Sequence, residues 1–478
     1  MKKWAKILCC LALFACVLAG CGTVGNINNT EKEIIYNGNA AVLVGNHLYY
    51  GNSHVDTDFE NEEAYRTSAG SSYLARLDTS KNMTGINADL SPKHVENVAS
   101  EVTGHDKSFM FVLGQNIYYA TPNIHKGEDA EGNVSNNFSF TTIYKSALNG
   151  DGKKELYTTT ADVTQIETLK FDGKYYIVIL AGEKLVKIDL SSDKATELAT
   201  GVKSAAMPET YEKSKVGSTL DWNGYVYYTT AKSDENSALS GYNVNRVAIN
   251  TEKAEAVYTA GGTKTITFLD RERDVLVYSI GSEVYVSTKS NNKNDFINSQ
   301  HLLQATSSIS GFNLVTSVST EQDGAKKETI HGYVFTSGSA LNYVTSNFAR
   351  EGAITFKDAA GTAITGYTTV LVSGRTVYLA TTSAIYKADI SSVFITSSET
   401  VTCQTIVTMT TIDTGAFAFD GDYVYYYAGL ETLESEGGET TEVEDDSLYL
   451  YRAKISSSQN AKAYQLLSAA QDSDRKNK

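Results

Sequence analysis

Proline and cysteine are both scarce in this chain of 478 residues, and each scarcity excludes a class of protein. Three prolines fall far below the usual share of ~5%, which excludes Pro-rich linkers and collagen-like repeats. Lysine and arginine total 41 against 56 acidic residues, a net charge of −15, which argues against a nucleic-acid binder that neutralises phosphates. Apolar residues make up 41% of the chain, and with 31 tyrosines they supply enough core to exclude disorder.

Long apolar runs are also scarce, and the one at residues 7–18 is too short to span a hydrocarbon core of ~30 Å as a helix. It follows a short basic head and ends in Leu18-Ala19-Gly20-Cys21, which resembles the bacterial lipobox. The resemblance implies cleavage before Cys21, transfer of diacylglycerol to its thiol, and anchoring at the extracytoplasmic face of a bacterial cell membrane. The alternative is a signal peptide that is cut elsewhere, with Cys21 incidental.

Five cysteines are present, and their positions leave one in the body of the chain. Cys9, Cys10 and Cys16 leave with the signal peptide, and Cys21 carries lipid. Cys403 lies in a segment, 400–407, that reads as a strand, so we expect a buried structural thiol and not a nucleophile. The mature chain therefore has no internal disulfide or cysteine metal cluster, and burial and backbone hydrogen bonds must hold its fold.

A weak repeat organises the chain from about residue 39 onward. Each copy has a Gly turn, a strand ending in paired aromatic residues as in Gly114-Gln115-Asn116-Ile117-Tyr118-Tyr119, a loop, and a second strand with a basic residue. Adjacent side chains of a strand face opposite ways, so each aromatic pair is expected to pack two neighbouring units; a sugar-stacking surface is the alternative. The copies begin near residues 45, 114, 173, 224, 273, 332, 374 and 421.

A period near ~50 residues built from four short strands predicts an all-β fold, a single β-propeller of four-stranded blades. Eight blades over residues 39–468 account for the repeats, and seven is the alternative because two copies are degenerate. The remaining segments are a lipoprotein signal peptide (1–20), the lipidated cysteine with a tether (21–38) and a polar C-terminal tail (469–478). The clearest blade places strands at 108–113, 116–120, 142–148 and 154–158.

The strand Ile143-Tyr144-Lys145-Ser146-Ala147-Leu148-Asn149-Gly150, which follows Ile117-Tyr118-Tyr119-Ala120, resembles the YWTD repeat of low-density-lipoprotein-receptor-type propellers. It is similar as well to TolB-like propellers of bacterial surface lipoproteins of unknown role. The resemblance covers about nine-tenths of the chain and implies the fold, not the ligand. This chain has Tyr-Tyr where that family has Tyr-Trp, and it mostly lacks the family's Asp.

Motifs that carry catalysis are absent from the sequence. There is no Gly-x-Ser-x-Gly elbow, no His-Glu-x-x-His, no Walker A loop and no EF-hand pattern. The segment 56–60 starts like a Ca²⁺ loop but lacks the glycine at position six, so a solvated turn is the preferred interpretation. We therefore expect a protein that is not an enzyme and has no catalytic residues, no resident cofactor and no metal site.

Four predicted connections between the paired strands are long: 52–72, 120–141, 230–242 and 428–447. Ring closure would place the last beside the first. The connections 428–447, 52–72 and 120–141 would then be neighbours and form one acidic patch with sixteen acids and two basic residues. Clustered carboxylates attract cations or a basic partner and could chelate Ca²⁺, while the plainer interpretation is solvated loops that keep a surface protein soluble. The acids are Asp56, Asp58, Glu60, Glu62, Glu63, Glu128, Asp129, Glu131, Glu431, Glu434, Glu436, Glu439, Glu442, Glu444, Asp445 and Asp446.

Taken together, these features predict a lipid-anchored, extracytoplasmic scaffold that binds an unknown protein, peptide or glycan, contacts the membrane through Cys21 and binds no nucleic acid. The first alternative is an enzyme acting on carbohydrate or peptide at the mouth of the propeller channel, which needs two acids at a fixed separation. The second is a component of an envelope complex without a small ligand.

Overall fold

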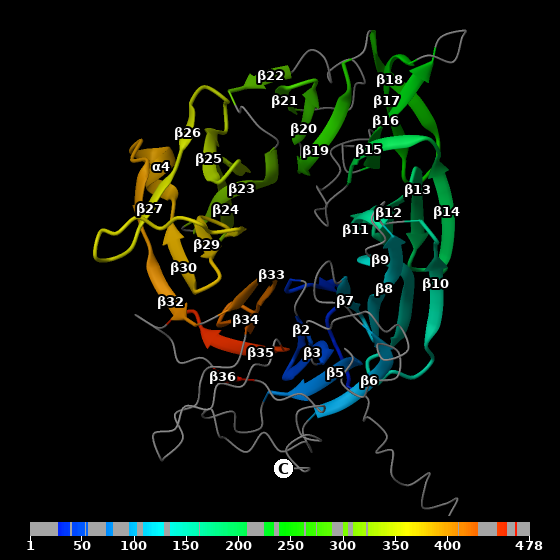
Figure 1. The fold of residues 1–478 in the computed structure, drawn as a ribbon, viewed down its shortest axis with the longest axis horizontal. Helices are drawn as coiled ribbons and strands as arrows, with labels where there is room; N and C mark the ends of the chain where they lie inside the picture. The colour runs from blue at the N-terminus through cyan, green and yellow to red at the C-terminus, as the bar shows by residue number, and fades with distance from the viewer. Residues whose placement is uncertain are drawn as a thin grey trace, which may run out of the picture.

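A computed structural model shows the chain as a closed ring of eight four-stranded antiparallel sheets around a central axis (Figure 1). This confirms an all-β propeller with eight blades and not seven. The structure describes residues 27–38, 41–52, 54–55, 73–79, 95–102, 109–128, 134–161, 163–207, 224–233, 239–261, 264–273, 275–288, 300–304, 309–321, 324–409, 411–428, 447–456 and 464–465.

The first four blades run from the innermost strand outward in chain order. Blade 1 is β2 (Ala41–Val44), β3 (His47–Asn52), β5 (Tyr73–Asp78) and β6 (Val95–Val102). Blade 2 is β7 (Met110–Leu113), β8 (Asn116–Glu128), β9 (Val134–Ala147) and β10 (Lys154–Thr158). Blade 3 is β11 (Val163–Phe171), β12 (Lys174–Ala181), β13 (Lys184–Asp189) and β14 (Lys194–Ala199), and blade 4 is β15 (Val202–Ala206), β16 (Tyr225–Ser233), β17 (Leu239–Ala248) and β18 (Ala254–Gly261).

The last four blades repeat this arrangement. Blade 5 is β19 (Ile266–Glu272), β20 (Val275–Ile280), β21 (Glu283–Thr288) and β22 (Gln300–Leu303), and blade 6 is β23 (Ile309–Thr320), β24 (Lys326–Ser337), β25 (Ala340–Thr345) and β26 (Glu351–Ala353). Blade 7 is β28 (Thr369–Ser373), β29 (Thr376–Ala380), β30 (Ala384–Asp389) and β32 (Gln404–Thr408). Blade 8 is β33 (Ile412–Phe419), β34 (Tyr423–Ala428), β35 (Ser447–Lys454) and β36 (Tyr464–Gln465).

Antiparallel strands give the ring two distinct edges. The tight turns between first and second strands, such as those at Gly45 and Gly114, leave at one edge, which we call the turn rim. Both glycines have φ of +58°, a conformation that favours glycine in a two-residue hairpin turn. The connections between second and third strands leave at the opposite edge, which we call the loop rim.

The paired tyrosines belong to the core, as predicted. Tyr49 packs into the seam between blades 1 and 2, whereas Tyr50 packs into the seam between blades 8 and 1. Tyr118 and Tyr119 divide in the same way between the two seams of blade 2. All four side chains are at most 2% exposed, because successive strand residues point to opposite faces and both faces of a blade are covered.

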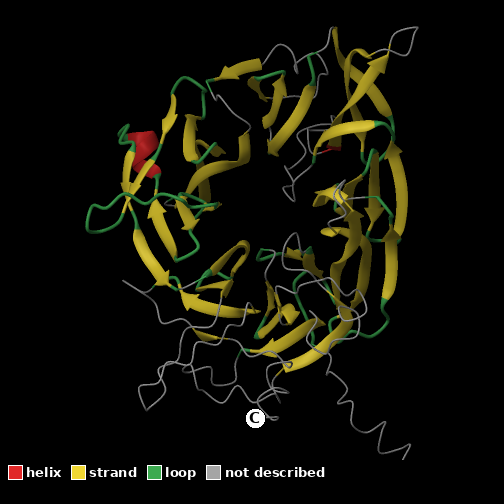
Figure 2. Ribbon diagram, viewed as in Figure 1, coloured by secondary structure: helices red, strands yellow, loops and turns green. Residues whose placement is uncertain are grey.

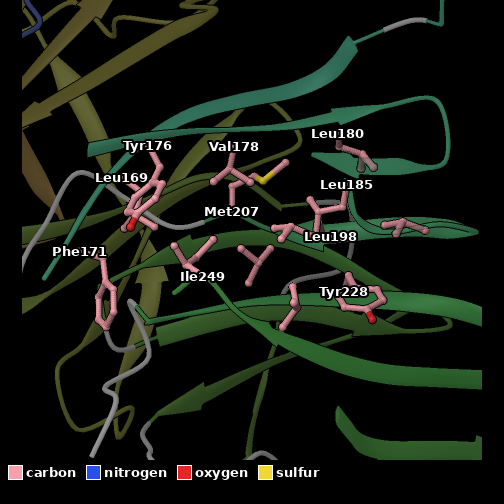
Figure 3. Close-up of a cluster of buried hydrophobic side chains, with 14 residues drawn as sticks. Leu169, Phe171, Tyr176, Val178, Leu180, Leu185, Leu198, Met207, Tyr228 and Ile249 are labelled. Atoms are coloured by element: carbon pink, nitrogen blue, oxygen red, sulfur yellow. The ribbon is translucent and has the colours of Figure 1, made fainter. Parts of the chain in front are cut away.

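Figure 3 shows one such seam, between blades 3 and 4. Val178 of blade 3 lies beside Met207, which follows β15 of blade 4, and Leu169 and Tyr228 belong to the same apolar cluster. Burial of layers of this kind supplies most of the stabilisation that a chain without disulfides requires.

Basic residues in the third strands of several blades donate the same hydrogen bond to the next blade, which we call a third-strand tie. The guanidinium of Arg76 donates to the carbonyl oxygen of Leu148 in blade 2 (3.4 Å), and the ammonium of Lys187 donates to that of Ile249 in blade 4 (2.5 Å). Lys387 makes the same contact with Ile455 in blade 8. In each case the acceptor follows the third strand of the next blade, so the basic residue of the sequence repeat has a structural role.

Two predicted loops are shorter than expected because their strands continue to pair. The segment 120–141 is largely a hairpin, in which β8 and β9 pair as far as Glu128 and Val134. The segment 230–242 is likewise shortened, since β16 reaches Ser233 and β17 starts at Leu239. Continued pairing satisfies backbone N–H and C=O groups that a loop would leave to solvent.

Blade 6 corrects another prediction, that of a turn near residue 332. Gly332 lies inside β24, and the chain reverses between Thr320 and Lys326, where the N–H of Glu321 donates to the carbonyl of Ala325 (2.8 Å). A Cβ at Gly332 would lie 2.6 Å from the ring of Phe394, so this glycine permits close packing of α4 (Ser391–Ile395), the helix drawn in Figure 2. Close by, β27 (Thr355–Lys357) pairs in parallel with β31 (Thr400–Thr402).

The ring closes between blades 8 and 1 by contacts at both rims, and each of these two blades keeps its own four strands. At the loop rim, β4 (His54–Val55) pairs with the start of β35, and the Tyr427 hydroxyl donates to the carbonyl of Gly51 (2.8 Å). Towards the turn rim, Gly38 bridges to Ala418 of β33. These contacts at both rims join the first and last blades of the ring.

Residues 27–38, which we call the N-terminal segment, belong to the predicted tether of 21–38 and pack on the ring. Within the segment, β1 (Ile34–Ile35) adds a fifth strand inside β7 of blade 2. The reason is that Ile34 and Ile35 bury apolar surface in the seams of blade 2 while their backbone pairs with β7.

Among the helices of the described residues, none has the length and apolar character needed to cross a membrane.

Candidate functional site

The seam between blades 7 and 8 opens into a cavity of about 570 Å³ on the axis side of the ring. The Thr369 hydroxyl of β28 donates to the carbonyl of Thr414 in β33. Between this hydrogen bond and the turn rim, β28 and β33 form opposite walls of the cavity. Leu371 and Ser373 line one wall, and Phe417 lines the other. The cavity therefore lies where the seam is not filled by side chains of its own two blades.

Aromatic rings form much of the wall. The rings of Tyr378 and Phe419 meet across the seam with centroids 4.6 Å apart, and both side chains are half-buried. Burial raises the pKa of the Tyr378 phenol, so this group is neutral and can donate a hydrogen bond at physiological pH. The cavity thus combines apolar faces with hydroxyl groups.

Tyr36 of the N-terminal segment completes the site. Its side chain is 59% exposed and lines the cavity from the axis side. The surrounding ring displaces bulk water, and this raises the pKa of Tyr36 to about 12, with a smaller contribution from the carboxylate of Glu167. Tyr36 is therefore accessible and uncharged.

Contacts of the two residues that follow it hold Tyr36 in place. The Asn37 amide donates to the carbonyl of Phe419 (2.8 Å) and accepts from the N–H of Leu43 (2.8 Å). Gly38 has φ of +131° and pairs with Ala418, where a Cβ would lie 2.8 Å from the Ala418 Cα and would also collide with the backbone of Phe417. A residue with a side chain would push the segment away from the ring.

The earlier part of the N-terminal segment is held on blades 2 and 3 at the turn rim. Asn29 donates to the carbonyl of Gly114 in the first turn of blade 2 (2.7 Å). Glu33 accepts from the Tyr175 hydroxyl (2.6 Å) and the Lys170 ammonium (2.9 Å), and these two partners lower the pKa of its carboxyl, Tyr175 more than Lys170. The segment thus contacts blades 1, 2, 3 and 8.

The predicted acidic residues and Cys21 fall outside the described residues, apart from Glu128, whose backbone ends β8. The structure nevertheless places the attachment points of two predicted acidic connections together at the loop rim. Val55, which lies near the start of the connection 52–72, pairs with Ser447, which ends the connection 428–447. For the connection of blade 2, the described backbone shows the hairpin reported above.

Cys403 is buried and unpaired with another cysteine, as predicted for a structural thiol. It lies between β31 and β32, so the predicted single strand over 400–407 is interrupted there. Burial raises the pKa of its thiol to about 12, which leaves no thiolate for nucleophilic attack at neutral pH. Within the described ranges, no three His, Cys, Asp or Glu side chains are grouped to hold a metal ion.

The cavity was not predicted from the sequence, because Tyr36 lies in the segment assigned to the tether. The available signal was the short apolar run Ile34-Ile35-Tyr36 just before the first repeat. Such a run has no period of its own, and its position on the ring depends on contacts with blades far along the chain.

Comparisons with known proteins find similarity to solved structures alone. No family model and no curated protein matches the chain. Apo AztD from Citrobacter koseri is similar over 82% of this chain and 91% of its own, with 10% identity and a TM-score of 0.43.

Two further solved structures are similar in part. TolB from Acinetobacter baumannii matches 52% of this chain at 12% identity with a TM-score of 0.28. Pyrococcus horikoshii acylaminoacyl peptidase matches 78% at 12% identity with a TM-score of 0.38. The chain spans 56% and 54% of the length of these two structures. The likenesses concern the fold, and the assignment as an eight-bladed propeller rests on the sheets themselves.

Proposed function

We propose that this protein is a non-catalytic binding scaffold, anchored by lipid at Cys21 on the extracytoplasmic face of a bacterial membrane, with its acidic connections directed away from the bilayer. The observation that carries the proposal is that two parts of the chain lie at opposite rims of the ring. The N-terminal segment lies on the turn rim, and the connections after Val55 and before Ser447 leave from the loop rim.

Covalent geometry supports this orientation. Six residue steps separate Cys21 from Ile27, which is the first described residue, and a fully extended chain covers at most about 20 Å over that length. Asn29 is hydrogen-bonded at the turn rim, so a lipid on Cys21 would hold that rim close to the membrane. The predicted acids would then face the surroundings, where their charge attracts cationic partners.

The anchor is tested by metabolic labelling with a fatty acid and by membrane fractionation. Wild-type protein is expected to take up label and sediment with membranes, and Cys21→Ser is expected to do neither. Cys403→Ser, which removes the buried thiol, is the matched control and should behave as wild type. Sedimentation and labelling of Cys21→Ser would reject the anchor.

The acidic connections are tested separately with a lysine decapeptide as probe at low ionic strength. Replacing the eight acids of 431–446 by their amides keeps the length of the segment and should weaken binding, because the attraction is electrostatic and screened by salt. A variant with the same residues of 431–446 in shuffled order should retain binding. Equal binding by wild type and the amide variant would reject a role for these acids.

A further inference from the structure

We propose that the cavity between blades 7 and 8 binds one ring of an uncharged saccharide. The site is formed by β28 and β29 of blade 7, β33 of blade 8 and Tyr36 of the N-terminal segment, and blades 7 and 8 lie next to each other in Figure 1. Its volume of about 570 Å³ is in the range of small-ligand sites, which are concave and lined by apolar groups with a few polar ones.

The absence of charge in the lining indicates an uncharged ligand. Among the residues that the structure describes, no carboxylate, ammonium or guanidinium lines the cavity. Two acids of blade 8 have partners of their own: Asp420 accepts from the N–H of Tyr423 and the hydroxyl of Tyr425 (both 2.7 Å), and the Oδ1 atom of Asp413 accepts from the N–H of Gly415 (2.8 Å). A phosphate, carboxylate or ammonium bound here would lose water without gaining a partner.

The mixture of rings and hydroxyls distinguishes a saccharide from a purely apolar ligand. Tyr36 offers an exposed ring face, and Tyr378 and Phe419 form a tilted pair on the wall. The C–H faces of a pyranose pack on such rings, while its hydroxyl groups need donors and acceptors. The exposed Ser373 and the hydroxyl groups of Tyr36 and Tyr378 supply them at the edge of the cavity.

Two sources can present the same chemistry. A free saccharide reaches the cavity from solvent, and this source is independent of the proposed anchor. The second source, the head group of an uncharged glycolipid, rests on the proposed function, because only an anchored turn rim would face the bilayer. The cavity runs from the axis to the turn rim, at Ser373 and Gly421, so both routes reach it.

Calorimetric titration of the full-length protein tests the proposal. The probes are glucose, galactose, N-acetylglucosamine, lactose and maltose, with glucuronate and glucosamine as charged counterparts and p-cresol as an apolar aromatic. We expect binding of at least one uncharged saccharide and weaker binding of its charged counterparts. Tyr36→Ala should weaken that binding about 10-fold, whereas Tyr36→Phe should retain it within about 3-fold because the stacking face remains.

Leu302→Ala is the matched control, since Leu302 is 58% exposed on the outer strand β22, far from the cavity, and its loss should change nothing. For the glycolipid source, Cys21→Ser is mixed with phosphatidylcholine vesicles with and without digalactosyl diacylglycerol. Selective binding to the glycolipid vesicles supports the head group as ligand, and binding of free saccharide alone supports the soluble source.

Three results would overturn the proposal. The first is that no uncharged saccharide binds, either free or as a glycolipid head group. The second is that p-cresol or glucuronate binds more tightly than every uncharged saccharide, and the third is that Tyr36→Ala binds saccharide with the affinity of the wild type. The circular dichroism of Tyr36→Ala must match that of wild type, which its exposed position leads us to expect. Saccharide binding by Cys21→Ser would support the cavity proposal even if the lipid anchor were rejected. The tests of the two proposals are therefore independent.

Discussion

Gly38 holds the N-terminal segment against blade 8 at a point where no other residue fits. Its φ of +131° and the contact of a would-be Cβ with the Phe417 backbone both exclude a side chain. We expect Gly38→Ala to release the segment, to destabilise the protein by more than about 2 kcal/mol and to expose residues 27–38 to proteolysis. Denaturant unfolding and limited proteolysis measure both effects.

Gly45→Ala is the control for Gly38→Ala. Gly45 has φ of +58°, but open space surrounds the added Cβ, so the cost should be about 1 kcal/mol of backbone strain, without release of the segment. Equal proteolysis of the two variants would contradict the role assigned to Gly38.

Cys403 gives a second prediction at the residue scale. Because burial raises the pKa of its thiol to about 12 and its side chain is 2% exposed, we expect no reaction with a disulfide reagent at pH 8 in the native protein. Reaction should become complete after unfolding in denaturant. Lys184→Cys, at an exposed position of β13, should react at once in the native protein, and rapid native labelling of Cys403 would contradict its burial.

At the scale of the elements, the seams depend on ties between neighbouring blades. Lys187 is 6% exposed, donates to the carbonyl of Ile249 and pairs with Glu252 (2.9 Å). Lys187→Met keeps most of the apolar stem but leaves a buried carbonyl without its donor, and we expect a loss of about 1–3 kcal/mol in the free energy of unfolding.

The control is Lys184→Met in the same strand. Lys184 is 61% exposed and lies 3.5 Å from Glu197, so its removal should cost less than about 1 kcal/mol. Thermal denaturation of both variants provides the comparison. Equal destabilisation would show that the third-strand ties add no stability beyond ordinary surface contacts.

The strands and their seams were predictable because the signals are local. A glycine turn, alternating strand residues and paired aromatics recur in each copy, and Tyr49 and Tyr50 face opposite seams for the geometric reason given by strand periodicity. The position of the blade 6 turn was not predictable, because Gly332 fits the repeat as a turn residue but is required for the approach of Phe394 from α4. A contact between segments distant in sequence leaves no local pattern.

At the scale of the whole molecule, closure of the ring couples the chain ends. The repeat predicted that blades 8 and 1 meet, and the pairing of Val55 with Ser447 brings the attachment points of two acidic connections together. The candidate cavity was not predictable, since it needs the inner strands of blades 7 and 8 and Tyr36 from the opposite end of the chain. Only the closed ring defines it.

In the orientation proposed above, the ring sits on the membrane with its turn rim facing the bilayer. Lys174 and Lys184 are both exposed and mark the turn rim and the loop rim of blade 3. They lie at opposite ends of the hairpin of β12 and β13, whose length is about 25 Å. We propose to label Lys174→Cys and Lys184→Cys with a fluorescent donor in the lipidated protein and to measure energy transfer to acceptor lipids at the vesicle surface.

We expect higher transfer efficiency from position 174 than from position 184, and loss of transfer in both variants when Cys21→Ser is added. Equal efficiencies, higher efficiency from position 184, or transfer that persists without Cys21 would contradict this orientation.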